Sequence, residues 1–171
     1  MIRATFALVL VFAQVPSGPQ VGDALPEAKV KGVYEPIAGK EFSLLERGKK
    51  EPTLIVFVQK FGRPAFRLLR EIDKLAAAEE KLNTNIVWIA EELEKTEAYL
   101  TKARPSLDFK SPVSISLDLK TGPQTYGLND QIAVTVLLAK DGKIVANIAL
   151  ADPNETDARK IGVEIKKLLD K

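Results

Sequence analysis

The chain contains no cysteine and no histidine in its 171 residues. Without cysteine there can be no disulfide, no thiol redox chemistry and no cysteine nucleophile. The absence of both residues also excludes Cys/His zinc sites and every relay in which an imidazole activates a serine or cysteine. The side chains that remain for chemistry are carboxylates, amines, guanidinium groups and hydroxyls.

Neither sign of charge dominates, and aromatic residues are scarce. Lysine and arginine number 25 against 23 aspartates and glutamates, which gives a net charge of +2, and aromatic residues make up 6%. Nucleic-acid binding needs a clustered basic face or a stacking platform. The longest basic cluster, Arg47–Lys50, is interrupted by Gly48, and we interpret it as a solvated turn. We therefore expect no nucleic-acid partner.

The N-terminus carries the features of an export signal. Arg3 supplies a positive charge, residues 4–13 are apolar apart from Thr5, and chain-breaking residues follow. A basic tip, an apolar stretch of this length and a small residue at its end are typical of a secretory signal. The stretch is too short to span a membrane, which takes about 20 residues. The alternative interpretation is a short apolar strand or helix of a cytosolic protein.

These features predict a three-part organisation. We expect a signal peptide over residues 1–13, cleaved after Ala13, a linker over 14–20 and one domain over 21–171. The mature chain would be periplasmic or extracellular and would have no membrane span once the signal is removed.

The rest of the chain alternates strand-like and helix-like segments. Apolar β-branched runs predict strands, and apolar residues spaced by three and four predict amphipathic helices. The turn at 36–40 and the Asp-Gly pair at 141–142 each predict a hairpin. The expected elements are strands 29–34, 41–45 and 53–59, helix 64–82, strand 86–90, helix 92–103, strands 113–117, 134–139 and 143–150, and a helix from about 154 to 170.

The order of these elements indicates an α/β domain. Alternating strands and helices give parallel pairing, whereas the last two strands pair as an antiparallel hairpin. We therefore expect a mixed central β-sheet flanked by helices on both faces, with an N-terminal β-hairpin. Two local signals set boundaries: Asn83–Asn85 ends the first long helix, and Arg104-Pro105 stops the second.

Five segments in order resemble the thioredoxin-like redoxin family, of the peroxiredoxin and thiol:disulfide interchange type. They are Val21–Pro26, Gly39–Leu44, Phe57–Leu75, Tyr126–Leu128 and Ala133–Val145. The resemblance covers about Val21 to Lys171 and implies a thioredoxin-like fold. Gly122–Asn129 with Lys140–Ala149 also resembles a group of exported planctomycete proteins of unassigned role.

The departures from this family concern its redox site. The Cys-Gly-Pro-Cys motif of the family falls on Gly62-Arg63-Pro64-Ala65, which keeps only the proline. The family's buried acid falls on Val56, and its cis-proline falls on Ala133. A cis bond without proline costs about 3 kcal/mol, so we expect a trans bond before Ala133. The resemblance thus implies a degenerate site that cannot exchange disulfides or reduce peroxides.

Two groups of charged residues remain as candidates for other chemistry. Lys60 and Arg63 flank the degenerate turn before a helix N-terminus, where a small anion could bind. Glu91, Glu92 and Asp118 follow two neighbouring strands, and carboxylates there could bind a hard cation or transfer protons. Each group also has a structural interpretation, as solvated ends of strands and helices.

We predict from this sequence an exported, non-redox thioredoxin-fold protein that acts as a binding or scaffold module. Its interaction face would combine Lys60, Phe61, Arg63, Glu91, Glu92 and Ile132. The partner would be an unidentified protein or peptide, with no cofactor, no metal and no catalytic residue. The alternative is an enzyme of another class that uses Glu91, Glu92 and Asp118 with Lys60 or Arg63, and a third interpretation is a domain with no specific ligand.

Overall fold

The structure is a computed structural model that describes residues 16–170. The predicted signal peptide lies outside the described residues. In chain order the elements are β1 (Lys29–Gly32), β2 (Glu41–Ser43), α1 (Leu44–Gly48), β3 (Thr53–Val58), α2 (Arg63–Ala77), β4 (Asn83–Trp88), α3 (Leu93–Leu107), β5 (Val113–Ser116), the 3-10 turn η1 (Gln124–Tyr126), β6 (Val134–Lys140), β7 (Lys143–Leu150) and α4 (Asp157–Leu169). The predicted alternation of strands and helices is confirmed, and so are both hairpins.

The strands form one mixed sheet in the order β2-β1-β5-β4-β3-β6-β7. β3 pairs parallel with β4, and β4 pairs parallel with β5, whereas β6 runs antiparallel to both β3 and β7. A central strand covered on both faces needs apolar residues at every position, and all six residues of β3 are buried. The predicted α/β class with a mixed central sheet is confirmed.

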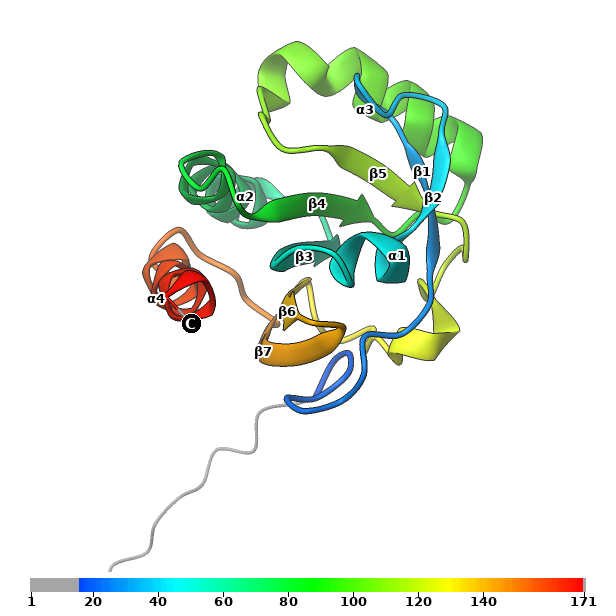
Figure 1. Ribbon diagram of the computed structural model, residues 1–171. Helices are drawn as coiled ribbons and strands as arrows, with labels where there is room; N and C mark the ends of the chain where they lie inside the picture. The colour runs from blue at the N-terminus through cyan, green and yellow to red at the C-terminus, as the bar shows by residue number, and fades with distance from the viewer. Residues whose placement is uncertain (1–15, 171) are drawn as a thin grey trace, which may run out of the picture.

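Helices flank both faces of this sheet, but unequally. The side chains of one face pack with α2, α3 and α4 in a core that includes Val56, Leu69 and Ile161. The other face, which carries Phe57, packs with Leu44 of α1 and with residues of η1 and the N-terminal segment. Figure 1 shows α2 and α4 on one side of the strands and α1 on the opposite side. α2 is the next element after the fully buried strand β3, so a short loop joins the end of β3 to the N-terminus of α2.

The second strand is shorter than predicted, because a helix begins within residues 41–45. Ser43 is the N-cap of α1, and its Oγ accepts the backbone N–H of Glu46 at 3.1 Å. Serine followed three residues later by glutamate is a capping-box pattern. The apolar pair Leu44 and Leu45 is therefore helical, and the strand ends at Ser43.

The first long helix also ends earlier than predicted. α2 stops at Ala77, and the N–H of Glu79 then donates to Ala76 O, while that of Leu82 donates to Glu79 O. Leu82 is only 8% exposed. It was expected to be buried as part of the helix, but these turns bring it into the core after the helix has ended. The three residues Asn83–Asn85, expected to end the helix, form the first half of β4 instead.

The second long helix continues through the proline that was expected to stop it. α3 extends to Leu107 with Pro105 inside its last turn. A proline so near the C-terminus removes only one backbone hydrogen bond, and Leu107 is buried at 4% exposure. The helix ends instead at Asp108, which adopts the left-handed conformation at φ 48° and donates its N–H to Arg104 O.

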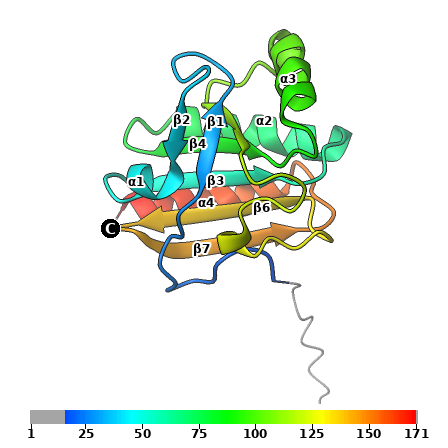
Figure 2. The same ribbon diagram turned by 90° about the vertical axis from the view of Figure 1, so that its right-hand side faces the viewer.

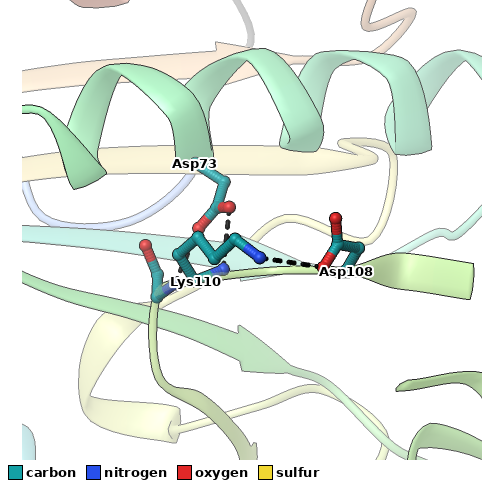
Figure 3. Close-up of polar contacts among 4 residues, drawn as sticks. Asp73, Asp108 and Lys110 are labelled. Carbon is teal, nitrogen blue, oxygen red and sulfur yellow. Dashed lines mark hydrogen bonds and ion pairs between the residues drawn. The ribbon is translucent and has the colours of Figure 1, made fainter. Parts of the chain in front are cut away.

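A buried aspartate fixes α2 to the loop before β5. Asp73 is 4% exposed, and its two carboxylate oxygens accept the backbone N–H groups of Lys110 and Ser111 at 2.9 and 2.8 Å. Figure 3 shows Asp73 reaching from α2 to Lys110, whose amine pairs in turn with Asp108 at 3.0 Å. Both oxygens of the buried charge are therefore occupied, which identifies Asp73 as a structural clamp.

The N-terminal segment lies along β7 and β6. Gly22 N donates to Ile144 O, Leu25 N donates to Gly142 O, and the side chain of Asn147 donates to Ser17 O and Pro19 O. Figure 2 shows this segment in blue beside β7. Residues 16–20, which belong to the expected linker, are thus hydrogen-bonded to the domain. Within residues 16–170 we find no helix long and apolar enough to cross a membrane.

Candidate functional site

The loop after β3 lies against the residue that precedes β6. Val58 pairs with Val134 at this edge of the sheet. Just beyond, the backbone N–H groups of Gln59 and Lys60 both donate to Ala133 O, at 2.9 and 3.1 Å. The carbonyl of Ala133 therefore holds the start of the degenerate turn in place, although the two segments are far apart in the sequence.

The turn Gly62–Ala65 forms the N-terminus of α2. Gly62 is the N-cap in an extended conformation, with φ −158°, and no side chain caps the helix. Pro64 lies within the first turn, where its missing N–H leaves no hydrogen bond unmade. Phe66 N donates to Gly62 O at 2.9 Å and closes the first helical turn. No acidic residue occupies this turn, so the positive end of the helix dipole is not neutralised by this segment.

A shallow hollow of about 280 Å³ brings the two predicted parts of the site together. Ala133 is on one side, and Gly62, Pro64 and Ala65 are on the other. The remaining lining residues are Lys60, Phe61, Ala151, Asp152 and Pro153. The degenerate turn and the cis-proline position therefore face one shared space. Glu35-Pro36 is the single cis peptide bond that residues 16–170 contain, so the bond before Ala133 is trans.

This hollow offers contact surface and neither a thiol nor a side-chain hydroxyl. Its lining carries methyl groups, two proline rings, one phenyl ring, an amine and a carboxylate. The Ala133 backbone is already fully used, since its N–H donates to Leu150 O and its carbonyl accepts two N–H groups. A ligand would therefore meet side chains here, and strand pairing with Ala133 is not available.

An aromatic cluster stands beside the hollow. Phe61, 39% exposed, lies 5.3 Å from Trp88 and 6.2 Å from Phe66 between ring centroids, and Phe109 lies 6.4 Å from both Phe66 and Trp88. Such edge-to-face and tilted pairs hold rings in fixed orientations. Trp88, the single tryptophan, is buried at 5% exposure as expected of a core residue. Phe61 is the most exposed ring of this cluster.

The predicted carboxylates do not converge. Lys120 N donates to Ala90 O, so the loops after β4 and β5 do meet. Glu91, Glu92 and Asp118 are nevertheless exposed, and Glu92 pairs with Lys95 at 2.7 Å on its own helix. In the part of the chain that the structure describes, no three acidic side chains are grouped so that they could hold a metal ion.

Ile132 requires a correction. It was expected to contribute to an exposed apolar patch with Phe61, but it is only 2% exposed. Asp130 and Gln131 form the exposed tip of the turn, and Ile132, whose N–H donates to Asn129 O, follows that tip back into the domain. Ile132 therefore cannot offer its side chain to a partner.

A closed ring of hydrogen bonds supports the loop from behind, and sequence reasoning missed it. The N–H of Asn129 donates to Ser17 Oγ, and Thr135 Oγ1, 2.7 Å from that oxygen, donates to Gln59 Oε1. The ring closes where Gln59 Nε2 donates to Asn129 O at 2.6 Å. Since the Thr135 proton is committed to Gln59, the Ser17 hydroxyl must donate to Thr135. Buried polar networks strengthen one another when fully satisfied, so this ring fixes the segment from which Lys60 emerges.

Solved structures share this architecture. A peroxiredoxin-like protein from Aquifex aeolicus has 18% identity and a TM-score of 0.63, covering 89% of this chain and 90% of that one. A thioredoxin-like protein from Porphyromonas gingivalis has 19% identity and a TM-score of 0.63, covering 85% of this chain and 92% of that one. The exposed lipoprotein thioredoxin of Streptococcus pneumoniae has 21% identity and a TM-score of 0.60, covering 85% and 100%.

The chain therefore has a thioredoxin-like fold and no cysteine. No protein-family model matches it and no curated protein is similar to it. The resemblance to exported planctomycete proteins accordingly stays a prediction.

Proposed function

We propose that this thioredoxin-fold chain is an exported, non-redox binding or scaffold module, and that the hollow at the start of α2 is its binding surface. The observation that carries the proposal is the composition of that hollow. Gly62, Pro64 and Ala65 line it together with Ala133, and its walls offer mainly apolar contact, with neither a thiol nor a side-chain hydroxyl. A preformed apolar hollow with a few polar groups is a typical binding site.

The chemistry of the walls favours a peptide with one apolar side chain. About 280 Å³ accommodates a single large side chain and not a cofactor. Phe61 offers an exposed ring at the rim, and Lys60 and Asp152 offer one charge of each sign. Because the Ala133 backbone is already hydrogen-bonded, we expect affinity to come from side-chain burial.

The alternative enzyme has less support. Glu91, Glu92 and Asp118 are exposed, and general acid–base catalysis needs a carboxylate held within hydrogen-bond reach of a substrate. Lys60 and Arg63 stand at the turn before α2, in the segment that borders the hollow. No observation on these residues favours catalysis over binding, and no reaction is proposed for them.

Titration with defined peptides tests the proposed surface. The probes are short acetylated peptides of glycine and serine with one central phenylalanine, leucine or alanine. Binding is followed by the fluorescence of Trp88, which contacts Phe61, and by the amide resonances of Phe61, Ala65 and Ala133. We expect the phenylalanine and leucine peptides to shift these signals and the alanine peptide to shift them least.

Two matched variants locate the effect. Ala151→Phe fills the hollow from its exposed rim and should abolish the shifts. Ala77→Phe adds the same ring at the other end of α2, about 21 Å away, and should leave them intact. If no peptide moves the three resonances, or if both variants behave alike, the hollow is not a binding surface and the interpretation without a specific ligand is preferred.

Export is tested separately. The proposal rests on the basic tip and the apolar residues 4–13 of the sequence. Expression of the full chain in a bacterial host should place it in the periplasm with Gln14 as its first residue, as measured by intact mass. A cytosolic product that retains Met1 would favour the cytosolic alternative without affecting the proposed hollow.

A further inference from the structure

Three arginines on the outer side of α2 form no ion pair with a carboxylate of residues 16–170. Arg63, Arg67 and Arg70 are exposed, and their spacing of four and three residues places them on one side of the helix. Every ion pair between residues 16 and 170 uses a lysine. The three guanidinium groups therefore form a row of unpaired cations that begins beside the hollow.

These arginines line a surface groove of about 510 Å³. Phe66 belongs to the same lining, and the guanidinium carbon of Arg70 stands 5.6 Å from the centre of its ring. An arginine stacked on an aromatic face is held in place while its edge keeps its N–H donors free. The groove thus presents oriented donors next to an apolar surface.

The remaining charges of the groove leave it basic. Lys74, Glu71 and Glu155 complete its ionisable lining, and Lys74 pairs with Glu71 at 2.6 Å. Four cations and two carboxylates give the groove a net charge of +2. Glu71 is thus engaged by a lysine, and Asp108, which lines a neighbouring hollow with Arg70, is engaged by Lys110 at 3.0 Å.

The other two long helices carry a different surface. Glu92 at the start of α3 pairs with Lys95, and Glu164 of α4 pairs with Lys167, each at 2.7 Å. Lys31 of β1 pairs with Glu97 of α3 at 2.8 Å. Exposed lysine–carboxylate pairs of this kind contribute little to the free energy of unfolding. Arg104 of α3 and Arg159 of α4 are also outside the ion pairs, but each is the single arginine of its helix, so within residues 16–170 a row of unpaired arginines is confined to α2.

We propose that this groove binds an acidic, extended segment of a partner protein, with its carboxylates on Arg63, Arg67 and Arg70. The guanidinium fork matches a carboxylate with two parallel hydrogen bonds. The helix rises about 10 Å from Arg63 to Arg70, the span of about three extended residues. The inference rests on the proposed function and adds the chemistry of the partner: acidic residues in the groove, continuing from the segment seated in the hollow.

The size of the groove favours a peptide over a nucleic acid. Affinity for nucleic acid grows with the number of phosphates neutralised, and it needs a basic stripe or face. Here the unpaired arginines occupy about two helical turns, and Glu71 and Glu155 lie among the lining residues. A few carboxylates on a peptide match this short row.

Fluorescence anisotropy of a labelled octaglutamate peptide tests the proposal. Binding to the purified protein should be measurable at low ionic strength and weaken with added salt, whereas octaglutamine should not bind. Arg67→Glu with Arg70→Glu should weaken binding by about tenfold or more, because two attractive contacts become repulsive. Arg67→Lys with Arg70→Lys keeps the charge and should lose about threefold, since lysine lacks the fork.

A matched pair of substitutions controls for net charge. Lys49→Glu with Lys50→Glu makes the same change in charge at exposed residues after α1, on the other face of the sheet. This variant should bind octaglutamate as the wild type does. Circular dichroism should show all three variants folded, because every substituted side chain is exposed.

Three results would overturn the assignment. Equal loss in the α2 and the Lys49/Lys50 charge reversals would mean general attraction to a basic protein. A labelled thymidine oligomer of matched charge that binds as tightly at physiological salt would point to nucleic acid. No binding of octaglutamate would remove the acidic partner. That last result leaves the proposed function intact if the apolar peptides still shift Phe61 and Ala133, so the two failures are distinguishable.

Discussion

The two ends of α2 differ in their polar groups: one end buries a carboxylate, and the other has no capping side chain. Near the C-terminal half, Asp73 buries a carboxylate and satisfies both of its oxygens with the N–H groups of Lys110 and Ser111. At the N-terminus, Gly62 and Ala65 border an apolar hollow, and no side chain caps the helix. The comparison shows that one end of α2 uses a buried polar group to hold two elements together, whereas the other end leaves an apolar surface open.

The clamp should give the largest effect. Asp73→Ala leaves the buried N–H of Ser111 and the part-buried N–H of Lys110 without acceptors, and an unsatisfied buried group costs about 1–3 kcal/mol. We expect the free energy of unfolding to fall by about 3 kcal/mol in urea denaturation. Asp108→Asn, which removes the charge that pairs with Lys110 and keeps a side chain that tolerates the left-handed conformation, is the control and should not move the midpoint. A similar loss in both variants would remove the distinction between the clamp and its surface neighbour.

The hydrogen-bonded ring behind the hollow should give the next effect. Ser17→Ala removes the acceptor of Asn129 N and the hydroxyl that faces Thr135. We expect a loss of about 1–2 kcal/mol by the same reasoning. Ser106→Ala, at an exposed position of α3, is the control. If Ser17→Ala is as harmless as Ser106→Ala, the N-terminal segment contributes nothing to the support of this loop.

A smaller effect concerns two buried tyrosines and alkaline pH. Burial raises the pKa of Tyr34 to about 12, and burial also raises the pKa of Tyr126 well above its usual 10. Between pH 10 and 12 the unfolded chain releases these protons while the folded chain retains them. The free energy of unfolding should therefore be constant below about pH 10 and fall as pH rises further.

Tyr34→Phe sharpens that measurement. The substitution removes the hydrogen bond from the Tyr34 hydroxyl to Leu100 O and should cost about 1 kcal/mol at neutral pH. It should also reduce the alkaline slope of unfolding free energy against pH without abolishing it, because Tyr126 still titrates. An unchanged slope would mean that Tyr34 ionises as freely in the folded chain as in the unfolded one.

The hollow should give the smallest change in stability. Gly62 is extended, and a Cβ there would meet only Pro64 Cδ at 3.9 Å, so Gly62→Cys with Ala65→Cys should cost less than about 1 kcal/mol. The paired thiols at a helix N-terminus should be oxidised by air to a disulfide, seen as a mass loss of two hydrogen atoms, and should accelerate insulin reduction by dithiothreitol. Gly62→Cys alone is the control. A double variant that stays reduced under air would contradict the expected geometry of the turn.

The elements were largely readable from the sequence, and the errors at the ends of the two long helices share one cause. Apolar spacing located β3 and the inner side of α2, but it could not tell how Leu82 and Leu107 reach the core. Leu82 arrives through turns after α2 ends, and Leu107 arrives by continuing α3 past Pro105. In both cases burial of one leucine outweighed a local signal, and burial is a property of the folded chain.

The candidate site was only partly readable. Gly62–Ala65 and Ala133 were assigned together by resemblance, and the structure places them around one hollow. Ile132 was misjudged because its neighbours Asp130 and Gln131 are exposed while it turns inward. The ring through Ser17, Asn129 and Thr135 left no signal, since single polar residues in three separate segments carry no spacing that links them.

The sequence by itself determined that no sulfur or imidazole chemistry is possible, because the atoms are absent, and that a buried strand precedes an amphipathic helix with arginines on its outer side. Only the tertiary structure decided which of those residues meet. It joined the β1–β2 hairpin to β5, aligned Ala133 with the start of α2, and left three guanidinium groups of the groove beside Phe66 outside every ion pair of residues 16–170. Composition and periodicity are local properties of a chain, whereas the pairing of distant groups depends on how the packed sheet brings them together.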